Sequence, residues 1–282
     1  MQRTVQAVTV GPLDSADRRQ AASRLYRDVF GYADPAHAVS PRLLRALLDH
    51  GGTALGAYDP AGSTLGFCYG FPAADALGAY HYSQAVAVHE RARGLGVGRA
   101  LKLAQADGAR RAGARAMRWA FDPLLTRNAH FNLAVLGARV STFHRSYYDE
   151  PGTDRAIADW ALDPGALEID RRAASADVAA IRDAAVGDGA EAASAARRGD
   201  VVRAGEGDGP GGRAVRWLVA PLDPASPAGA VATPAAAEVA EQLVAAFRDG
   251  YALVACVPTW QAESRHPSEP FALYVLGKEP CR

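Results

Sequence analysis

The stretch "ERARGLGVGRALKLAQADGARRAG", residues 90–113, carries the pattern that decides how this chain is interpreted. Three alternating glycines, Gly94, Gly96 and Gly98, follow Arg93 and precede a segment with helical spacing. Glycine weakens regular structure, so such a cluster indicates a backbone that makes an unusual turn or that something else approaches closely. The helix is expected to continue to Gly113, where a glycine commonly ends one.

Two common glycine-loop motifs do not fit this stretch. A dinucleotide fingerprint requires a third glycine or alanine at the sixth position, where the frames from Gly94 and Gly96 have Arg99 and Leu101. A phosphate-binding P-loop ends in Gly-Lys-Ser/Thr, which is absent here. The remaining interpretation is a set of backbone N–H groups at a helix N-terminus beside Arg93, a site for a phosphate or pyrophosphate. The alternative is a plain strand-to-helix turn with solvated arginines.

The helix after the glycines has one apolar face. Its expected members are Val97, Leu101, Ala104, Gly108 and Ala112, whereas Arg99, Lys102 and Arg110 are expected to lie off that face. Arg110 and Arg111 suit the negative C-terminal end of the helix dipole.

Around this loop, apolar spacing predicts a mixed α/β fold with one sheet. Ser40 and Pro41 provide the cap and first turn of the second helix. The expected order is strand 4–10, helix 14–30, helix 40–52, a hairpin over 53–71, strand 78–89, the glycine loop and its helix, strand 116–123, helix 126–138 ending at Gly137, and strand 139–148.

The pattern weakens after Trp160. Residues 164–213 are rich in small and charged residues and are predicted to be a flexible connection, with "GEGDGPGGR" (205–213) as a plain loop. Order is predicted to return at 214–221. A helix over 234–250 follows, then paired strands over 251–257 and 271–277; Val239, Leu243, Val244 and Phe247 share one face of that helix.

Composition limits the class of protein and its partners. The 282 residues suffice for one large domain or two modest ones, and 31 basic residues balance 31 acidic ones. The chain therefore has no excess of positive charge that would indicate a nucleic acid or an anionic membrane as its partner. Cys68, Cys256 and Cys281 have no metal-ligand spacing, which argues against a disulfide framework or a metal site. No apolar run reaches the roughly 20 residues that span a bilayer, and the N-terminus turns polar too early for a secretory signal, so we expect a cytoplasmic protein.

The sequence "VAVHERARGLGVGRAL" resembles motif A of the GNAT acyltransferase superfamily, in which a strand leads through Arg/Gln-x-x-Gly-x-Gly/Ala into a helix. Arg93 to Gly98 match this motif, and Arg91 to Gly96 match it in an overlapping frame. The resemblance covers about residues 4–162. It implies a GNAT fold, a mixed sheet flanked by helices, in an acyl-CoA-binding domain over 1–163. Residues 164–213 would then be the connection and 214–282 a C-terminal α/β extension.

A narrower likeness lies in "WAFDPLLTRNAHFNLAVLGA", "SYYDE" and "DRAIADW". These stretches resemble uncharacterised GNAT-related proteins with a C-terminal extension, some of which resemble N-acyltransferases acting on amino acids.

The resemblance also implies which residues contact acetyl-CoA or another acyl-CoA. The loop would hold the pyrophosphate, the strand before it would pair with the pantetheine amides, and the Val88 amide would donate to the oxyanion. Asn128 and Asn132, four apart on one helix, could touch pantetheine or substrate, although Asn128 could instead only cap that helix. The expected contacts are Val86, Ala87, Val88, Arg93, Gly94, Leu95, Gly96, Val97, Gly98, Arg99, Asn128 and Asn132.

The catalytic residues of the superfamily are matched poorly. The strand 79–88 contains no carboxylate, so Tyr80, His81 and Tyr82 are its only candidate relay groups, and His81 has the most suitable ordinary pKa. These aromatic residues could equally fill the core. Leu133 occupies the position of the usual tyrosine acid, and Tyr147 or Tyr148 on the following strand could replace it, or no side chain at all. We select His81, Tyr82 and Tyr148 as catalytic candidates.

Asp122 could bind an amine or fix the turn before Pro123. His130 and His144 are interpreted as surface or packing residues, and the sequence shows no metal cluster and no Ser-His-Asp triad.

The sequence therefore predicts an N-acyltransferase that moves an acetyl or succinyl-type group to the amine of a small molecule, such as an amino acid or specialised metabolite. Two alternatives stay open: O-acylation or decarboxylation on the same coenzyme, and a non-catalytic acyl-CoA-binding module. No nucleic acid or membrane partner is expected, and a homodimer is left open.

Overall fold

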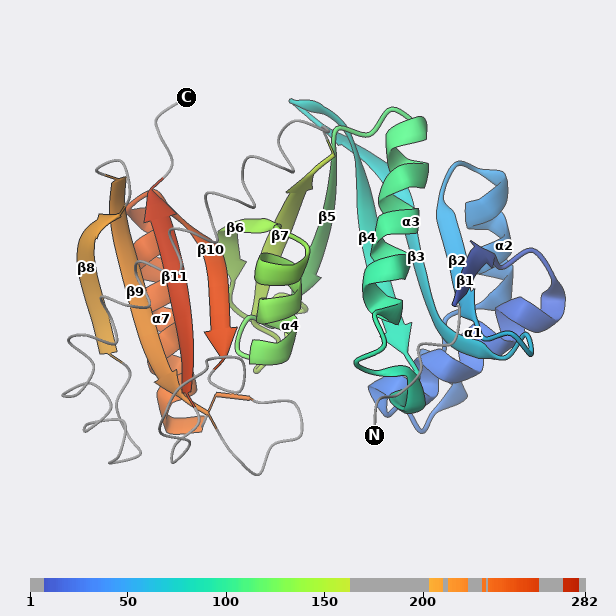
Figure 1. The fold of residues 1–282 in the computed structure, drawn as a ribbon, viewed down its shortest axis with the longest axis horizontal. Coiled ribbons are helices and arrows are strands. Elements are labelled where there is room, and N and C mark those ends of the chain that lie inside the picture. The colour runs from blue at the N-terminus through green and yellow to red at the C-terminus, as the bar shows by residue number, and fades with distance from the viewer. Residues whose placement is uncertain are drawn as a thin grey trace. The chain divides into compact units, whose positions relative to one another are not determined.

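The computed structural model describes residues 8–162, 203–209, 213–222, 230–231, 233–258 and 271–278. Contacts divide the chain into two compact units: the first comprises Met1–Trp119 and Ala161–Asp163, and the second Ala120–Trp160 and Pro164–Arg282. Each unit is a sheet with helices packed on it (Figure 1). The mixed α/β fold class expected from the sequence is confirmed. The finer division into 1–163, 164–213 and 214–282 stays a prediction.

The sheet of the first unit joins an antiparallel meander to one parallel strand. Neighbouring strands in it are antiparallel from β1 to β4, and β4 pairs with β5 in parallel. Its strands are β1 (Thr9–Pro12), β2 (Thr53–Tyr58), β3 (Thr64–Asp75), β4 (Gly78–Val88) and β5 (Ala116–Phe121), whose last two residues belong to the second unit.

Local capping signals set the helices of the first unit. Ser15 Oγ accepts a hydrogen bond of 3.2 Å from the Arg18 backbone N–H at the start of α1, and Gly31 ends that helix at φ 72°. Ser40 is the N-cap residue of α2 as expected, but its side chain makes no capping hydrogen bond. The helices are α1 (Ala16–Phe30), the 3₁₀ turn η1 (Pro35–His37), α2 (Pro41–Asp49), the 3₁₀ turn η2 (Glu90–Ala92) and α3 (Val97–Arg111).

These helices cover opposite faces of the first sheet. On one face, α1 and α2 pack on buried residues such as Phe67 and Tyr69. On the other, α3 lies over β2, β3 and β4 and packs against Cys68 (Figure 1). Because side chains alternate along a strand, the face on which a β3 or β4 residue lies determines its surroundings.

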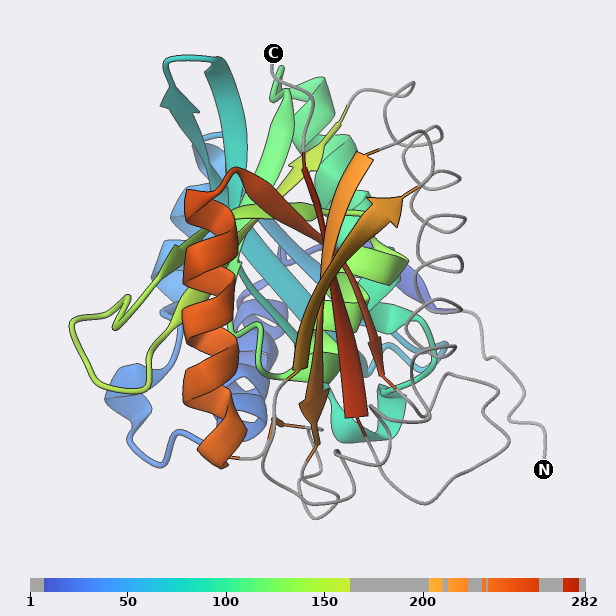
Figure 2. The same ribbon diagram turned by 90° about the vertical axis from the view of Figure 1, so that its left-hand side faces the viewer.

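The second unit has an antiparallel sheet in the order β7-β6-β10-β11-β9-β8. Helix α7 packs along one face of it, against β6, β9 and β10 (Figure 2). The elements are α4 (Thr126–His130), the π-helical segment η3 (Phe131–Val135), β6 (Arg139–His144), β7 (Arg155–Ala161, whose last residue belongs to the first unit), β8 (Arg203–Gly209), β9 (Arg213–Pro221), α7 (Thr233–Arg248), β10 (Tyr251–Pro258) and β11 (Phe271–Lys278).

The structure corrects several expected elements. Strand 4–10 is observed as Thr9–Pro12, and residues 1–7 lie outside the described part. The helix over 126–138 divides into α4 and the π-helical segment, and strand 139–148 ends at His144. Strand β7 was not expected at all.

The predicted loop over 205–213 was wrong for residues 205–209, which belong to β8, and for Arg213, which begins β9. The β8 residues pair with β9 along the whole strand, from Arg203 opposite Val219 to Gly209 opposite Arg213. Gly205 lies against the Trp217 ring, where a Cβ atom would collide with it. The strand partner thus outweighs the poor strand propensity of glycine. The rest of the connection, 164–202 and 210–212, lies outside the described residues.

Candidate functional site

The glycine loop between β4 and α3 has the strained backbone that its composition predicts. Gly94 and Gly96 adopt φ angles of 79° and 77°, a region that other residues rarely occupy. A Cβ atom on either residue would meet nothing within 4 Å, so the space beside the backbone is open. The loop is anchored next to these glycines by Ala92 and Val97, which are buried against the sheet.

Backbone donors are exposed where this loop enters α3. Gly96 is the N-cap residue of α3 and provides no capping side chain. The Ala100 N–H donates to Gly96 O at 3.0 Å, so the N–H groups of Val97, Gly98 and Arg99 precede the first intrahelical bond. Arg93 and Arg99 are exposed on either side and form no ion pair with a described residue. This arrangement of N–H groups, helix dipole and arginines suits a bound phosphate.

Strand β4 presents free backbone groups just before the loop. The His89 N–H donates to Leu65 O at 2.8 Å, so by strand alternation the N–H groups of Val86 and Val88 point away from β3. On that other edge, β4 pairs with β5 only at His81 and Tyr82 among the described residues. An extended ligand could therefore hydrogen-bond to this edge at Val86 and Val88, whereas the backbone groups of Ala87 face β3. The coenzyme contacts expected for these three residues stay a prediction.

Asn128 and Asn132 lie in the second unit, on α4 and the π-helical segment. Asn132 is buried and Asn128 is exposed. Leu125, not Asn128, is the N-cap residue of α4, which makes no side-chain capping bond, so the capping alternative for Asn128 is wrong. A coenzyme contact from either asparagine stays a prediction.

His81 lies beneath α3 with 2% of its surface exposed. Its Nε2 lies 2.9 Å from Thr53 Oγ1 and 3.5 Å from Gln105 Nε2. Burial, and secondarily the charge of Lys102, lowers the pKa of His81 to about 4. The ring is therefore neutral near pH 7 and held inside the protein, which favours the core alternative of the sequence analysis over a relay role.

The other two catalytic candidates have different surroundings. Tyr82 lies on the opposite face of β4 from His81, with its ring 5.4 Å from that of Phe71. Tyr148 belongs to the second unit and is 51% exposed in the turn after β6, between the positive-φ residues Ser146 and Asp149. A catalytic role for either tyrosine stays a prediction.

Two further residues are explained by packing and turn geometry. Leu133, at the position of the usual acid, is 2% exposed and belongs to the core. Asp122 Oδ1 accepts a hydrogen bond of 2.9 Å from the Leu124 N–H, which supports the turn-fixing role, and burial raises the pKa of this carboxyl.

Sequence reasoning missed a group of buried polar side chains under α3. Lys102 was expected off the apolar face of that helix, yet it is 3% exposed and Gln105 is also buried. Lys102 Nζ donates to Ser83 Oγ at 2.9 Å, and Ser83 Oγ donates to Gln105 Oε1 at 2.7 Å. One signal was present in the sequence: of the 31 basic residues, only Lys102 and Lys278 are lysines.

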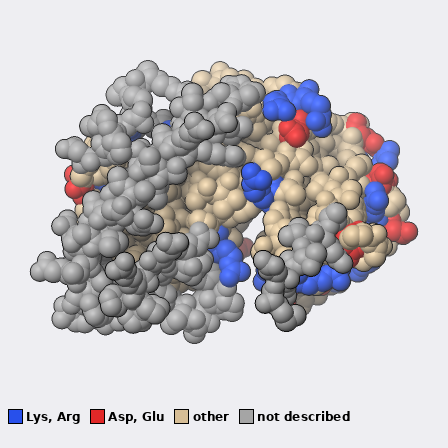
Figure 3. Space-filling view, in the orientation of Figure 1, with Lys and Arg blue, Asp and Glu red and all other residues tan. Residues whose placement is uncertain are grey.

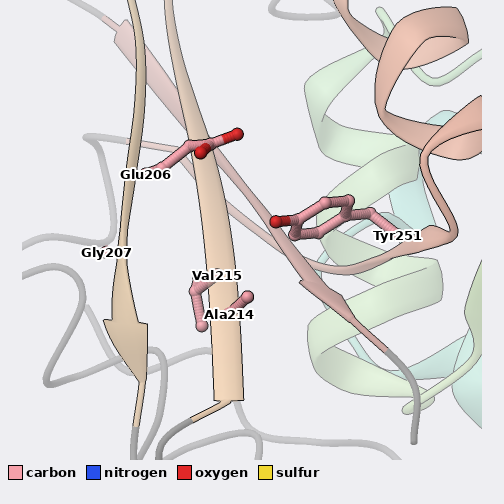
Figure 4. Close-up of a pocket in the computed structure, with 5 residues that line it drawn as sticks. All are labelled: Glu206, Gly207, Ala214, Val215 and Tyr251. Atoms are coloured by element: carbon pink, nitrogen blue, oxygen red, sulfur yellow. The ribbon is translucent and has the colours of Figure 1, made fainter.

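A shallow depression of about 260 Å³ in the second unit is lined by Glu206, Gly207, Ala214, Val215 and Tyr251 (Figure 4). Glu206 there is paired with Arg216, so its carboxylate is already engaged.

Acidic and basic groups lie close together on the surface of the first unit (Figure 3). Among the described residues, no metal-binding cluster occurs and no helix is long and apolar enough to cross a membrane.

Comparison with known proteins gives similarity in structure only. No family model and no curated protein matches the chain. The chain is similar to GNAT acetyltransferases over about half its length.

Three of these solved structures illustrate the similarity. One from Desulfovibrio desulfuricans is 20% identical with a TM-score of 0.47, covering 56% of this chain and 100% of that one. One from Kribbella flavida is 25% identical with a TM-score of 0.45, covering 55% and 98%. The Salmonella typhimurium protein yncA, solved with acetyl-CoA, is 18% identical with a TM-score of 0.46, covering 56% and 95%.

Proposed function

We propose that this protein is an acyl-CoA-dependent N-acyltransferase whose loop 93–98 binds the coenzyme's pyrophosphate. The observation that supports this most directly is the pair of left-handed glycines, Gly94 and Gly96, leading into an uncapped helix beside exposed Arg93. The unpaired edge of β4 then receives the pantetheine arm. The acyl group is of the acetyl or succinyl class, and the acceptor is a small amine such as an amino acid or specialised metabolite.

The backbone of β4 supplies the main catalytic interaction in this proposal. Bound acyl-CoA supplies an activated thioester, whose carbonyl carbon forms a bond to the neutral amine as the bond to sulfur breaks. The Val88 N–H, directed away from β3, donates to the oxyanion that develops at that carbon. A donor of this kind is worth about 10²–10³ in rate. The amine proton passes to water, directly or through the Tyr82 hydroxyl, which donates its own proton as it accepts one, because His81 is held beneath α3. Coenzyme A leaves as its thiolate.

A matched pair of glycine variants tests the loop. Gly96→Val places a branched side chain in the open space beside the loop, and we expect the Kd for coenzyme A to rise at least about tenfold. Gly113→Val is the control, because Gly113 has a similar φ of 86° at the other end of the same helix. Calorimetry checks both variants. Equal weakening in the two would mean that backbone strain, and not the loop, is responsible.

A thiol-release assay with a panel of amines tests the reaction itself. Release of free thiol together with an N-acyl product, identified by mass spectrometry, supports the proposal. Release without an N-acyl product would indicate the alternative chemistries, and binding without release would indicate a coenzyme-binding module.

A further inference from the structure

Lys102 is a buried basic side chain that contacts no acidic side chain among the described residues. It lies on the face of α3 that packs on the sheet and is 3% exposed. Its Nζ donates to Ser83 Oγ at 2.9 Å and lies 3.5 Å from the centroid of the Trp119 ring. An ammonium group is costly to bury, so such a position requires a structural or functional reason.

The two groups that Lys102 contacts lie on different strands, at one particular place. Strands β4 and β5 pair at His81 with Met117 and at Tyr82 with Arg118, and the ladder ends there among the described residues. Ser83 and Trp119 are the next residue on each strand. Lys102 therefore connects β4 to β5 at the point where the free edge of β4 begins.

A hydrogen-bonded chain holds Lys102 in this position. Ser83 Oγ donates to Gln105 Oε1, and Gln105 Nε2 donates to Thr53 Oγ1 at 2.8 Å. Gly70 leaves the room that this chain needs, since a Cβ atom there would lie 2.6 Å from His81 Nε2 and 3.0 Å from Gln105 Nε2. The position of the amine is thus determined by β2, β3, β4 and α3 together.

The choice of lysine is informative because this chain uses arginine almost everywhere else. The other lysine, Lys278, is exposed on β11. A guanidinium is larger and does not lose its proton in proteins, whereas an amine can titrate. Burial lowers the pKa of Lys102 to about 7. The titratable groups that face it are Cys68, whose pKa burial raises to about 12, and the neutral His81.

We propose that Lys102 is a positioning residue for the coenzyme, holding β4 and β5 at the spacing in which the edge at Val86 and Val88 accepts the pantetheine arm. This inference rests on the proposed function. The ammonium form donates to Ser83 and interacts with the Trp119 ring, and the neutral amine loses most of the ring attraction. Coenzyme affinity therefore falls as the pH rises past the titration of Lys102.

Calorimetric titration with coenzyme A tests the inference in the intact protein. Lys102→Met keeps most of the length of the side chain but removes its charge, and Lys278→Met is the matched control. We expect Lys102→Met to raise the Kd at least about tenfold at pH 6, with the difference from wild type shrinking toward pH 9. We expect Lys278→Met to bind like wild type throughout.

Two further measurements test the inference independently of the Lys102→Met variant. Ser83→Ala removes the hydroxyl on β4 that accepts from Lys102 and donates to Gln105, and it should also raise the Kd, even if Lys102→Met fails to fold. Lysine labelled with ¹⁵N at Nζ gives two signals, and the Lys102 signal should titrate near the pH at which coenzyme affinity changes. Folded Lys102→Met and Ser83→Ala proteins with wild-type affinity at every pH would overturn the inference. Wild-type protein that binds no coenzyme A would instead overturn the proposed function, and the inference with it.

Discussion

At the scale of single residues, the ordinary chemistry of a side chain was a poor guide to the catalytic candidates. His81 has the most suitable ordinary pKa of any residue on its strand, but its ring lies under α3 and its pKa is about 4. A base must lie within reach of the proton that it removes, and its pKa should be near the working pH. The burial of His81 and its low pKa are both unfavourable for such a role.

Variants of β4 should therefore have modest effects on turnover. We expect His81→Ala and Tyr82→Phe each to lower kcat less than the roughly 100-fold that is the low end for a general acid–base residue. Steady-state kinetics with saturating acyl-CoA measures this, after circular dichroism shows that each variant is folded. A larger loss in either variant, with coenzyme binding unchanged, would identify that residue as the missing base or acid.

At the scale of elements, two features of α3 that suit the proposed function are unfavourable for its stability. Its N-terminus leaves backbone donors open, and its buried face contains Lys102, whose charged form is disfavoured by burial. Residues positioned for function often reduce stability, because the geometry that function needs is not the most stable one. For Lys102, we expect this loss of stability to be measurable.

The pH dependence of folding stability should reveal the cost of burying Lys102. The folded protein holds this amine at a pKa of about 7, against 10.5 in an unfolded chain, so between these values the unfolded chain binds more protons. With respect to this group, the free energy of unfolding is therefore highest above about pH 10.5. It decreases by about 1.4 kcal/mol for each pH unit as the pH falls from there to about 7. The slope should be measured between about pH 7 and 8, where Cys68, whose pKa burial raises to about 12 in the folded protein, stays mostly protonated in the unfolded chain as well.

Lys102→Met should remove that slope and unfold at a higher temperature than wild type at pH 7, because a buried apolar group replaces a buried charge. Thermal unfolding at several pH values measures both effects, with Lys278→Met as the control. A variant that is more stable yet binds coenzyme A less well would separate positioning from folding. A wild-type slope retained in Lys102→Met would show that another group titrates.

At the scale of the whole molecule, the C-terminal segment takes part in the core of the second unit and is not an appendage to it. Strand β10 pairs with β6 at Leu253 and Val140, and both residues are fully buried. Tyr274 Oη donates to Pro123 O at 3.0 Å, linking β11 to the turn after β5. The second unit thus joins residues 120–160 to residues that follow them by more than ninety positions.

Truncation after Asp163 should consequently damage residues that remain in the chain. Removing β10 exposes the edge of β6 and the core around Val140, and each large apolar side chain loses about 1.5–3 kcal/mol of burial. We expect an insoluble protein or one that unfolds at a clearly lower temperature, measured by calorimetry against the full chain. Unchanged stability and activity in the truncated protein would show that residues 164–282 are dispensable.

Much of the fold followed from local signals in the sequence. The turn at Gly94 and Gly96 and the first helix, predicted over 14–30 and observed over Ala16–Phe30, depend on residues within a few positions of one another, so spacing was enough to predict them. The same holds for the hairpin over 53–71 and for the pairing of 251–257 with 271–277, where apolar strands are complementary.

Only the tertiary structure decided which faces turn inward. Lys102 and Gln105 are polar by sequence and become buried because Ser83 and Thr53, from other strands, satisfy their hydrogen bonds. The face of His81 and the strand at 203–209 depend in the same way on distant partners, α3 and β9. Local propensity and periodicity contain no information about such partners, so the glycine loop could be predicted from the sequence, whereas the burial of Lys102 on α3 could not.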